Sequence, residues 1–385
     1  MNFYPIYRNK KLLPWIKWWL IKGNKVAPKH LSEWINSAQP ITLTGAYKGS
    51  PLLFLNLNGN TSQTGTPTPE APVPVNVVKG NNTIKINDTD YQVNLKSKNL
   101  FDKSTVTNGY YLNESGGLTA NGNYCVSDYI QITEGETYYI PTRGTSRTKF
   151  YTSSKTAYSN TWDVTDGSKN FIVPSGVSYI RISISISGGT AVSLDTFMFN
   201  LGTTALPYEP YYDYELCKIG NYQDRIYYEG GKWYVDKYIE KVVLNGGESW
   251  STRTGGTTYA YTLSNFFDSS NREGLCDYFK YVRAGASSTQ NTECVASAGT
   301  NKTLNIFTNN TSLDTVANLK TWLSTHNTSV YYVLAESTTT EITETTLLSQ
   351  LEAIYNCKLN SGTNTITQTP SDLPFYLNFR YYEKG

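Results

Sequence analysis

The sequence predicts a mainly β protein built from β-sandwich modules, and three observations lead to this prediction. The 385 residues include 32 Tyr but only two Met and two His, a composition rich in strand formers. Charged residues make up only 17% of the chain, so Thr, Ser and Asn must cover the outer faces of strands. Apolar and hydroxyl side chains also alternate in short runs that are separated by turn residues. At this length there is room for two or three domains.

Residues 1–40 are predicted to form a basic, tryptophan-rich helical arm. Seven Lys and Arg and no acidic residue occur in residues 1–30, which leaves 26 basic against 31 acidic residues in the rest. A second short helix is predicted in "APKHLSEWINSAQP", starting near His30. We expect the arm to dock onto another protein, because Trp is a common interface anchor. A membrane-interface segment and a helix packed on its own domain are the alternatives. The candidate docking residues are Trp15, Trp18, Trp19 and Trp34.

Residues 41–96 are predicted to form a small β region that contains a stiff, proline-rich strap. Proline fixes φ and lacks an N–H group, so it cannot pair within a central strand. The strap is therefore expected to stay extended as a spacer. After it, "TIKINDTDYQVNL" predicts a hairpin with a turn around Asn87–Asp90. The prolines are Pro67, Pro69, Pro72 and Pro74.

Residues 97–210 are predicted to form the first β-sandwich module. Its clearest strand is "YIRISISISGG", in which Ile180, Ile182, Ile184 and Ile186 alternate with Arg and Ser. This alternation predicts one buried face and one solvent-facing face. Such strands are typical of two packed sheets.

Residues 211–245 are predicted to form a hairpin connector that turns at Glu229, Gly230 and Gly231. Tyr227 and Tyr228 precede the turn, and Trp233 and Tyr234 follow it. Cross-strand aromatic pairs of this kind stabilise a two-stranded ribbon.

Residues 246–385 are predicted to form a second sandwich module with two embedded helices. In "SLDTVANLKTWLSTHN" Ser312 is the expected N-cap, ahead of a stripe formed by Val316, Leu319, Trp322 and Leu323. In "TTLLSQLEAIYN" the apolar positions Leu347, Leu351 and Ile354 share one helix face.

No catalytic, metal or cofactor site is predicted. His30 and His326 are the only imidazoles, and neither lies near a nucleophile motif; His326 is interpreted as a residue at a helix end. The five cysteines lack metal-ligand spacing and are expected to be buried, reduced thiols, which suits synthesis in a reducing cytoplasm. The net charge of +2 argues against a nucleic-acid partner.

Glycoside hydrolysis stays open as an alternative, since it needs only two carboxylates. Asp163 and Asp166 lie beside Trp162, although turn-forming Asp residues are the favoured interpretation. Sugar binding without cleavage agrees better with this composition, because flat aromatic rings stack on sugar faces. The candidate glycan-binding residues are Trp162, Trp250, Tyr110 and Tyr111.

The segment "LNLNGNTSQTGTPTPEAPVPVNVVKG" resembles one that recurs in minor structural, tail-fibre and receptor-binding proteins of bacteriophages of Gram-positive bacteria. "KNLFD" at residues 98–102 and the run from Gly202 to Leu244 look like later landmarks of the same group, as does "LKTWLSTHNTSVYYVLAE". The resemblance covers about residues 50–385. The landmark residues of the first segment are Gly59, Thr61, Gln63, Gly65, Pro67, Thr68, Pro69, Pro72 and Pro74.

The resemblance implies a virion protein of the tail or baseplate with jelly-roll domains similar to carbohydrate-binding modules. It implies assembly as an oligomer, of which a homotrimer is favoured, contacts with other virion proteins through residues 1–40, and binding to host cell-wall polysaccharide. The strap would then hold receptor-facing modules at a fixed distance from an anchor. The alternatives are a tail-associated polysaccharide depolymerase, a purely structural adaptor or head fibre, and a bacterial surface adhesin.

Overall fold

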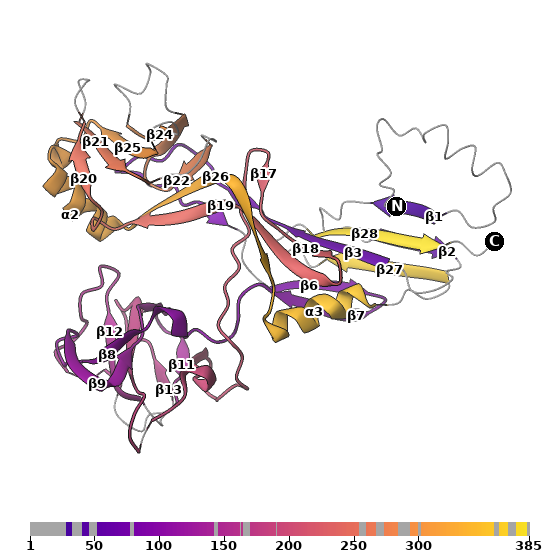
Figure 1. Ribbon diagram of the computed structural model, residues 1–385, viewed down its shortest axis with the longest axis horizontal. Helices are drawn as coiled ribbons and strands as arrows, with labels where there is room; N and C mark the ends of the chain where they lie inside the picture. The colour runs from indigo at the N-terminus through magenta and orange to yellow at the C-terminus, as the bar shows by residue number, and fades with distance from the viewer. Residues whose placement is uncertain are drawn as a thin grey trace.

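The structure, a computed structural model, describes residues 28–32, 41–45, 52–77, 81–141, 145–161, 163–164, 170–189, 191–253, 259–266, 273–283, 293–298, 302–357, 362–368 and 375–382. It is mainly β, which confirms the predicted class at that level. The sheets are curled, and the strands in these described ranges pair antiparallel except for one parallel pair. Two lobes lie at one end of an elongated set of sheets (Figure 1).

The elongated part, which we call the stem, contains strands from both ends of the chain. One stem sheet has the order β1-β28-β3-β18 and continues into β19, and the other has the order β2-β27-β6-β7. The helix α3 (Thr345–Tyr355) packs on the stem through Leu347, Leu351 and Ile354. These three residues are fully buried, as the apolar stripe in the sequence predicted. The strands are β1 (Pro28–Ser32), β2 (Ile41–Gly45), β3 (Leu52–Asn58), β6 (Asn81–Ile86), β7 (Thr89–Asn94), β18 (Arg225–Glu229), β27 (Gly362–Gln368) and β28 (Phe375–Tyr382).

The predicted short helix near His30 is wrong, because residues 28–32 form strand β1. Every residue of β1 pairs with β28, from Pro28 opposite Tyr382 to Ser32 opposite Asn378. A sheet edge satisfies these backbone groups, and such tertiary pairing overrides local helix propensity. The four candidate docking residues, Trp15, Trp18, Trp19 and Trp34, lie outside the described residues.

Two long strands, β19 (Lys232–Leu244) and β26 (Thr328–Glu341), join the stem to one lobe, and we call them the ribbon. They pair antiparallel from Tyr234 opposite Glu341 to Leu244 opposite Thr328. The predicted hairpin into β19 is confirmed: Gly230 and Gly231 turn with φ of 58° and 90°, as a tight hairpin turn requires. Its cross-strand pairs are Tyr228 with Trp233 and Tyr227 with Tyr234.

The lobe at the far end of the ribbon, the α2 lobe, is built around helix α2 (Val316–His326). Leu319 and Leu323 of α2 are fully buried against a sheet, as predicted, but the N-cap is Thr315 and not Ser312. Ser312 lies in the preceding 3-10 turn η5 (Thr311–Leu313), because the side chain of Asn310 caps that turn first. The strands are β20 (Trp250–Thr252), β21 (Tyr259–Ser264), β22 (Gly274–Cys276), β23 (Lys280–Arg283), β24 (Cys294–Ala298) and β25 (Thr303–Thr308).

Residues 246–385 therefore do not form one module, contrary to the prediction. The core of the α2 lobe extends into the first part of β26 through Val330 and Tyr332, whereas α3, β27 and β28 belong to the stem. Sequence order could not show this division, because β27 pairs with β6 and β28 pairs with β3 across roughly 280 to 330 residues of chain.

The second lobe consists of residues 97–210, and we call it body 97–210. A five-stranded sheet, β10-β14-β9-β8 with β12 also paired to β14, and a three-stranded sheet, β13-β11-β15, enclose one apolar core. Two 3-10 turns, η1 (Lys103–Thr105) and η2 (Leu194–Thr196), lie at its margin. The strands are β8 (Thr107–Leu112), β9 (Leu118–Val126), β10 (Ile130–Gln131), β11 (Thr137–Tyr139), β12 (Thr145–Tyr151), β13 (Asn170–Ile172), β14 (Tyr179–Ser185) and β15 (Asn200–Leu201).

The prediction that β14 has one wet face is wrong. Ile180, Ile182 and Ile184 are fully buried, as expected, but the alternating residues Arg181 and Ser183 are only 8% and 0% exposed. Other parts of the same body cover this second face, since Ser183 Oγ accepts a hydrogen bond from the Leu112 N–H and Arg181 Nε donates to the Ser127 carbonyl.

The proline-rich strap is not an extended spacer, which corrects the prediction. Its ends pair as β4 (Thr61–Ser62) and β5 (Asn76–Val77), so residues 61–77 fold back on themselves. We call residues 61–77 the proline clasp, because they dock on the α2 lobe: Gln63 Nε2 donates to the Cys276 carbonyl at 2.8 Å, and the Val73 N–H donates to the Asp277 carbonyl at 2.8 Å. Prolines suit such a loop, since they add no N–H group that needs a partner. A small pair, β16 (Lys218–Ile219) and β17 (Tyr222–Gln223), lies beside the ribbon.

Candidate functional site

The candidate site lies on the second face of the sheet in body 97–210. Strands β12 and β14 pair with Lys149 opposite Arg181 and Tyr151 opposite Tyr179. Cross-strand partners share a face, so these four side chains lie together, opposite the face that Phe150 and Ile180 turn to the core. The sheet thus carries one apolar face and one face of basic and phenolic side chains.

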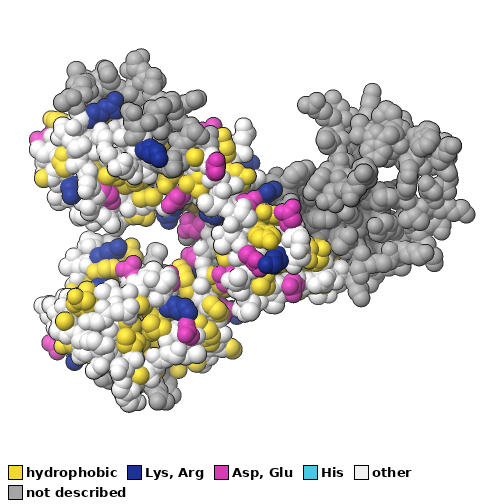
Figure 2. Space-filling view, viewed as in Figure 1, with side chains coloured by type: hydrophobic (Ala, Val, Ile, Leu, Met, Phe, Trp, Pro, Cys, Tyr) yellow, Lys and Arg dark blue, Asp and Glu magenta, His cyan; other side chains and the backbone are white. Residues whose placement is uncertain are grey.

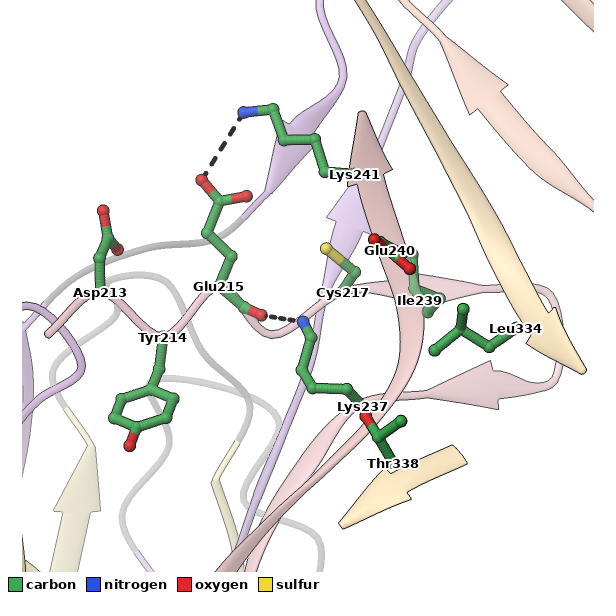
Figure 3. Close-up of a pocket in the computed structure, with 10 residues that line it drawn as sticks. All are labelled: Asp213, Tyr214, Glu215, Cys217, Lys237, Ile239, Glu240, Lys241, Leu334 and Thr338. Carbon is green, nitrogen blue, oxygen red and sulfur yellow. Dashed lines mark hydrogen bonds and ion pairs between the residues drawn. The ribbon is translucent and has the colours of Figure 1, made fainter. Parts of the chain in front are cut away.

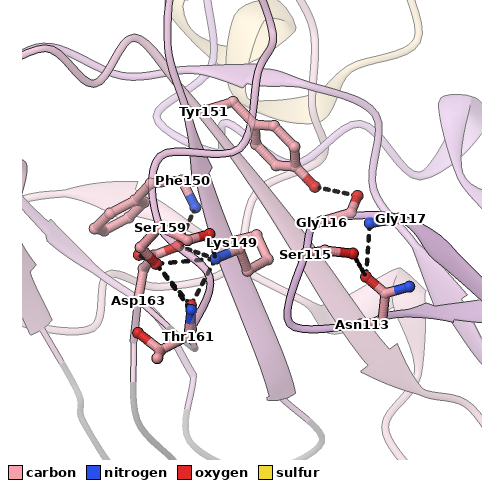
Figure 4. A network of polar contacts seen from close by, with 10 residues as sticks. All are labelled: Asn113, Ser115, Gly116, Gly117, Lys149, Phe150, Tyr151, Ser159, Thr161 and Asp163. Carbon is pink, nitrogen blue, oxygen red and sulfur yellow. Dashed lines mark hydrogen bonds and ion pairs between the residues drawn. The ribbon is translucent and has the colours of Figure 1, made fainter.

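A buried lysine organises the loop that follows β12 (Figure 4). Lys149 Nζ donates to the carbonyls of Ser159 and Thr161 at 2.9 and 2.5 Å, and it forms an ion pair with Asp163 Oδ2 at 2.9 Å. The Lys149 side chain has no exposed surface and that of Asp163 is 6% exposed. A buried charge needs such a complete set of partners. The ammonium group therefore holds Ser159, Thr161 and Asp163 in place.

Asp163 is fully engaged in this network. Its Oδ2 atom also accepts from the Phe150 N–H at 2.8 Å, and its Oδ1 atom accepts from Ser159 Oγ at 2.5 Å. Both oxygens of this carboxylate are thus occupied by donors within the protein, which leaves neither directed toward a substrate. The geometry of Asp163 thus argues against its role in glycoside hydrolysis, and Asp166 lies outside the described residues.

Tyr151 fixes a second loop of the same face, the turn after β8 (Figure 4). Its hydroxyl donates to the Gly116 carbonyl at 2.8 Å. Burial raises the pKa of Tyr151 to about 12, so the phenol stays protonated as a donor. Gly116 has a φ of +80°, and a Cβ there would lie 3.0–3.1 Å from Ala157 and Tyr151, so the turn requires glycine.

Tyr129 lies at the centre of an aromatic and cationic cluster on this face. Its ring centroid lies 4.8 Å from that of Tyr151 and 6.1 Å from that of Tyr179, both in edge-on contact. The guanidinium carbon of Arg181 lies 4.8 Å from the Tyr129 centroid, and Lys155 Nζ lies 4.9 Å from it. Tyr129 and Tyr179 are half-buried and Lys155 is exposed. The sequence did not reveal this cluster; the alternation in "TKFYT" places Lys149 with Tyr151 but does not show what covers them.

The structure separates the predicted glycan-binding residues. Tyr110 and Tyr111 are consecutive in β8 and so point to opposite faces; Tyr110 is 39% exposed, and Tyr111 lies under Arg147 at 4.0 Å from its ring centroid. The prediction that Trp250 contacts a glycan is wrong. Its side chain is 7% exposed, packs in the core of the α2 lobe, and donates a hydrogen bond from Nε1 to Glu248. Trp162 lies outside the described residues, between the anchored residues Thr161 and Asp163.

A separate pocket of about 490 Å³ lies beside the ribbon (Figure 3). Both of its lysines are already paired: Lys237 forms an ion pair with the buried Asp224 and donates to the Glu215 carbonyl, and Lys241 lies 3.7 Å from the Glu215 carboxylate. These contacts tie the segment after residue 212 to β19. We interpret the pocket as a structural junction.

The described residues also show the state of the cysteines, the acidic and histidine clusters and the helix lengths. All five cysteines are free and buried, as predicted. Among the described residues, no group of three or more His, Cys, Asp or Glu is placed to hold a metal ion. Of the helices in the described ranges, none has the length and apolarity that crossing a bilayer takes. On the face shown in Figure 2, Lys and Arg side chains are scattered among polar and apolar ones.

Comparisons with known proteins give no further guide. No family model matches the chain, and neither the curated proteins nor the solved structures contain a significant match.

Proposed function

We propose that this chain is a bacteriophage virion structural protein of the tail or baseplate, a fibre or receptor-binding component that engages host cell-surface glycans through body 97–210. The observation that carries the proposal is the rigid aromatic and cationic face around Tyr129. Both loops that border it are fixed from beneath, one by Lys149 and the other by Tyr151. Preorganised aromatic surfaces of this kind lose little entropy when they bind a ligand. The sequence landmarks from Gly59 to Pro74 support the virion assignment.

We further propose that body 97–210 and the α2 lobe are jelly-roll-like sandwich modules similar to carbohydrate-binding modules. In support, two curled sheets of body 97–210 enclose one core with Phe150, Ile182 and Phe199. The function proposed for them is binding without catalysis and without a cofactor. The locked carboxylate of Asp163 supports the non-enzymatic interpretation over a depolymerase.

Attachment to the particle is proposed to run through residues 1–40 and other tail or baseplate proteins. Strand β1 gives this proposal a physical basis, since its pairing with β28 places residues 28–32 at the edge of the stem sheet. Assembly into a homotrimer would multiply weak single-site binding into avidity. Nucleic acid is not proposed as a partner, because the scattered Lys and Arg in Figure 2 form no continuous basic track on that face of the described residues.

An imaging and blocking experiment tests the proposed function. Antibodies against body 97–210 are expected to label the tail end of the intact particle and to block its adsorption to host cells. Purified full-length protein is expected to bind isolated host cell walls and to release no reducing sugar from them. Labelling of an internal structure, or adsorption that the antibodies leave unchanged, would refute the receptor-binding role; released sugar would favour the depolymerase.

A further inference from the structure

The cluster around Tyr129 holds a buried positive charge for which the described part of the chain supplies no paired carboxylate. Arg181 is 8% exposed, and it contacts the Ser127 carbonyl, the Tyr129 ring and the phenol of Tyr151. Within the described ranges no carboxylate forms an ion pair with it. Lys149, the neighbouring buried cation, is paired with Asp163. Buried charges are ordinarily paired, so the environment of Arg181 is incomplete.

A second cation faces the same aromatic ring. Lys155 is exposed, and its ammonium lies 4.9 Å from the Tyr129 centroid and 5.7 Å from that of Tyr179. Among the described residues no ion pair within 4.0 Å joins Lys155 to an acidic group. The exposed Asp128 accepts from the Tyr129 N–H, and the structure shows no ion pair between it and either cation in the residues it describes. Two cations therefore share one tyrosine, and no carboxylate of the ranges described above forms an ion pair with either of them.

Flat aromatic surface adjoins this positive charge. Tyr129 and Tyr179 are half-buried and stand edge-on to each other, with 83° between their ring planes. A half-buried ring offers an apolar surface together with a hydroxyl group that can hydrogen-bond. A ligand that fits has an apolar ring face for a tyrosine and an anionic group for Lys155 and Arg181.

We propose that Tyr129, Lys155, Tyr179 and Arg181 form a binding site for an acidic glycan, one whose sugar units carry a carboxylate or are joined by phosphodiesters. Both groups offer anionic oxygens to a guanidinium and an ammonium group. This inference rests on the proposed glycan-binding function and deepens it by naming the class of glycan. The alternative is that Arg181 only packs on Tyr129 and contributes to the fold.

Titration of the intact protein with three oligosaccharides of equal length tests the proposal. One is neutral, one contains uronic acid, and one is an oligomer of glycerol phosphate; the last two distinguish a carboxylate from a phosphodiester. At least one anionic probe is expected to bind about tenfold more tightly than the neutral one at low ionic strength, and salt should weaken it. Equal affinity for neutral and anionic probes would overturn the acidic specificity.

Two site variants and a control locate the binding. Lys155→Gln removes an exposed charge and is expected to weaken anionic-probe binding about threefold to fivefold. Arg181→Lys keeps the charge but loses the planar fork, and it should also weaken binding. Lys98→Gln, an exposed lysine elsewhere in the body, should leave affinity unchanged.

The outcomes separate this inference from the function on which it rests. If Arg181→Lys fails to fold, Lys155→Gln decides the result alone, because its side chain is exposed. Unchanged anionic binding in Lys155→Gln would overturn the site while glycan binding survives. If the wild-type protein binds none of the three probes and no host wall polysaccharide, the proposed function falls as well.

Discussion

The ammonium of Lys149 and the carboxylate of Asp163 lie 2.9 Å apart, and both side chains are withdrawn from solvent in body 97–210. The pair joins strand β12 to the loop that ends at Asp163, and the carbonyls of Ser159 and Thr161 complete the contacts of the ammonium. Removing one partner of a buried ion pair leaves an uncompensated charge in a medium of low polarity. The pair is therefore the buried electrostatic contact among those that fix the loop bordering the proposed site.

Asp163→Asn and Lys149→Met are each expected to lower the free energy of unfolding of body 97–210 by about 3 kcal/mol. The measurement is native-state hydrogen exchange at the Phe150 N–H, which donates a hydrogen bond to Asp163. The matched control is Lys103→Met, which breaks the exposed pair with Asp195 and should leave exchange in the body unchanged. Equal effects in the control and the buried variants would contradict the role given to the pair.

Gln63 is expected to hold the proline clasp closed. Its Nε2 group donates to the carbonyls of Val73 and Cys276, both at 2.8 Å, so Gln63→Ala removes a link within the clasp and a link to the α2 lobe. The cost should be about 1–2 kcal/mol, and limited proteolysis should cut residues 64–72 faster. Gln92→Ala, at an exposed position of β7, is the control. Unchanged cleavage in Gln63→Ala would show that the clasp does not depend on this side chain.

The buried carboxyl of Asp277 should make the folded protein less stable as the pH rises. Burial raises the pKa of this carboxyl to about 6 from 3.8, so the folded state favours the protonated form. The contribution of protonated Asp277 to the free energy of unfolding is fully present below about pH 3.8 and is lost as the pH rises through about 6.

Asp277→Asn is expected to remove this dependence, because the amide keeps an oxygen for the Ser329 N–H. Relative to wild type, the variant should gain roughly 1 to 2 kcal/mol on going from pH 4 to pH 7, after allowance for partial exposure. Urea unfolding of both proteins at the two pH values measures the difference. A gain that is the same at both values would contradict the titration of Asp277.

Alanine substitutions of Trp250 and Tyr110 are expected to differ in their effect on stability, although the sequence predicts both residues as candidates for sugar contact. Trp250→Ala should destabilise the α2 lobe by about 3 to 5 kcal/mol, because the side chain packs with Leu244 and Leu263. Tyr110→Ala should leave stability within about 0.5 kcal/mol, since the ring is exposed. Thermal unfolding followed by tryptophan fluorescence measures the first effect, and circular dichroism measures the second. A stable Trp250→Ala variant would contradict the core assignment.

The sequence predicted elements where periodicity alone decides the answer. The stripe of Leu347, Leu351 and Ile354 indicated α3, and the Gly230–Gly231 turn indicated the hairpin into β19. Periodicity shows which residues share a face but not what covers that face. For this reason the sequence predicts that the second face of β14 is exposed to solvent, and it does not predict that Lys149 is buried.

Long-range pairing explains the remaining errors. Strand β1 forms because β28, some 350 residues later, offers it a sheet edge, and nothing local to His30 indicates this. The proline clasp folds back because Gln63 and Val73 find partners at Cys276 and Asp277. The Tyr129 cluster likewise draws on β12, β14 and the segments beside them, so its members are not recognisable together in the sequence.

The most direct test of the account maps the bound glycan on the intact protein. Backbone amide resonances are recorded while fragments of host-envelope polysaccharide are added. The account predicts that the largest shifts fall at Tyr129, Lys155, Tyr179 and Arg181, with the stem unaffected. Shifts confined to the stem or the α2 lobe, with body 97–210 unchanged, would contradict it.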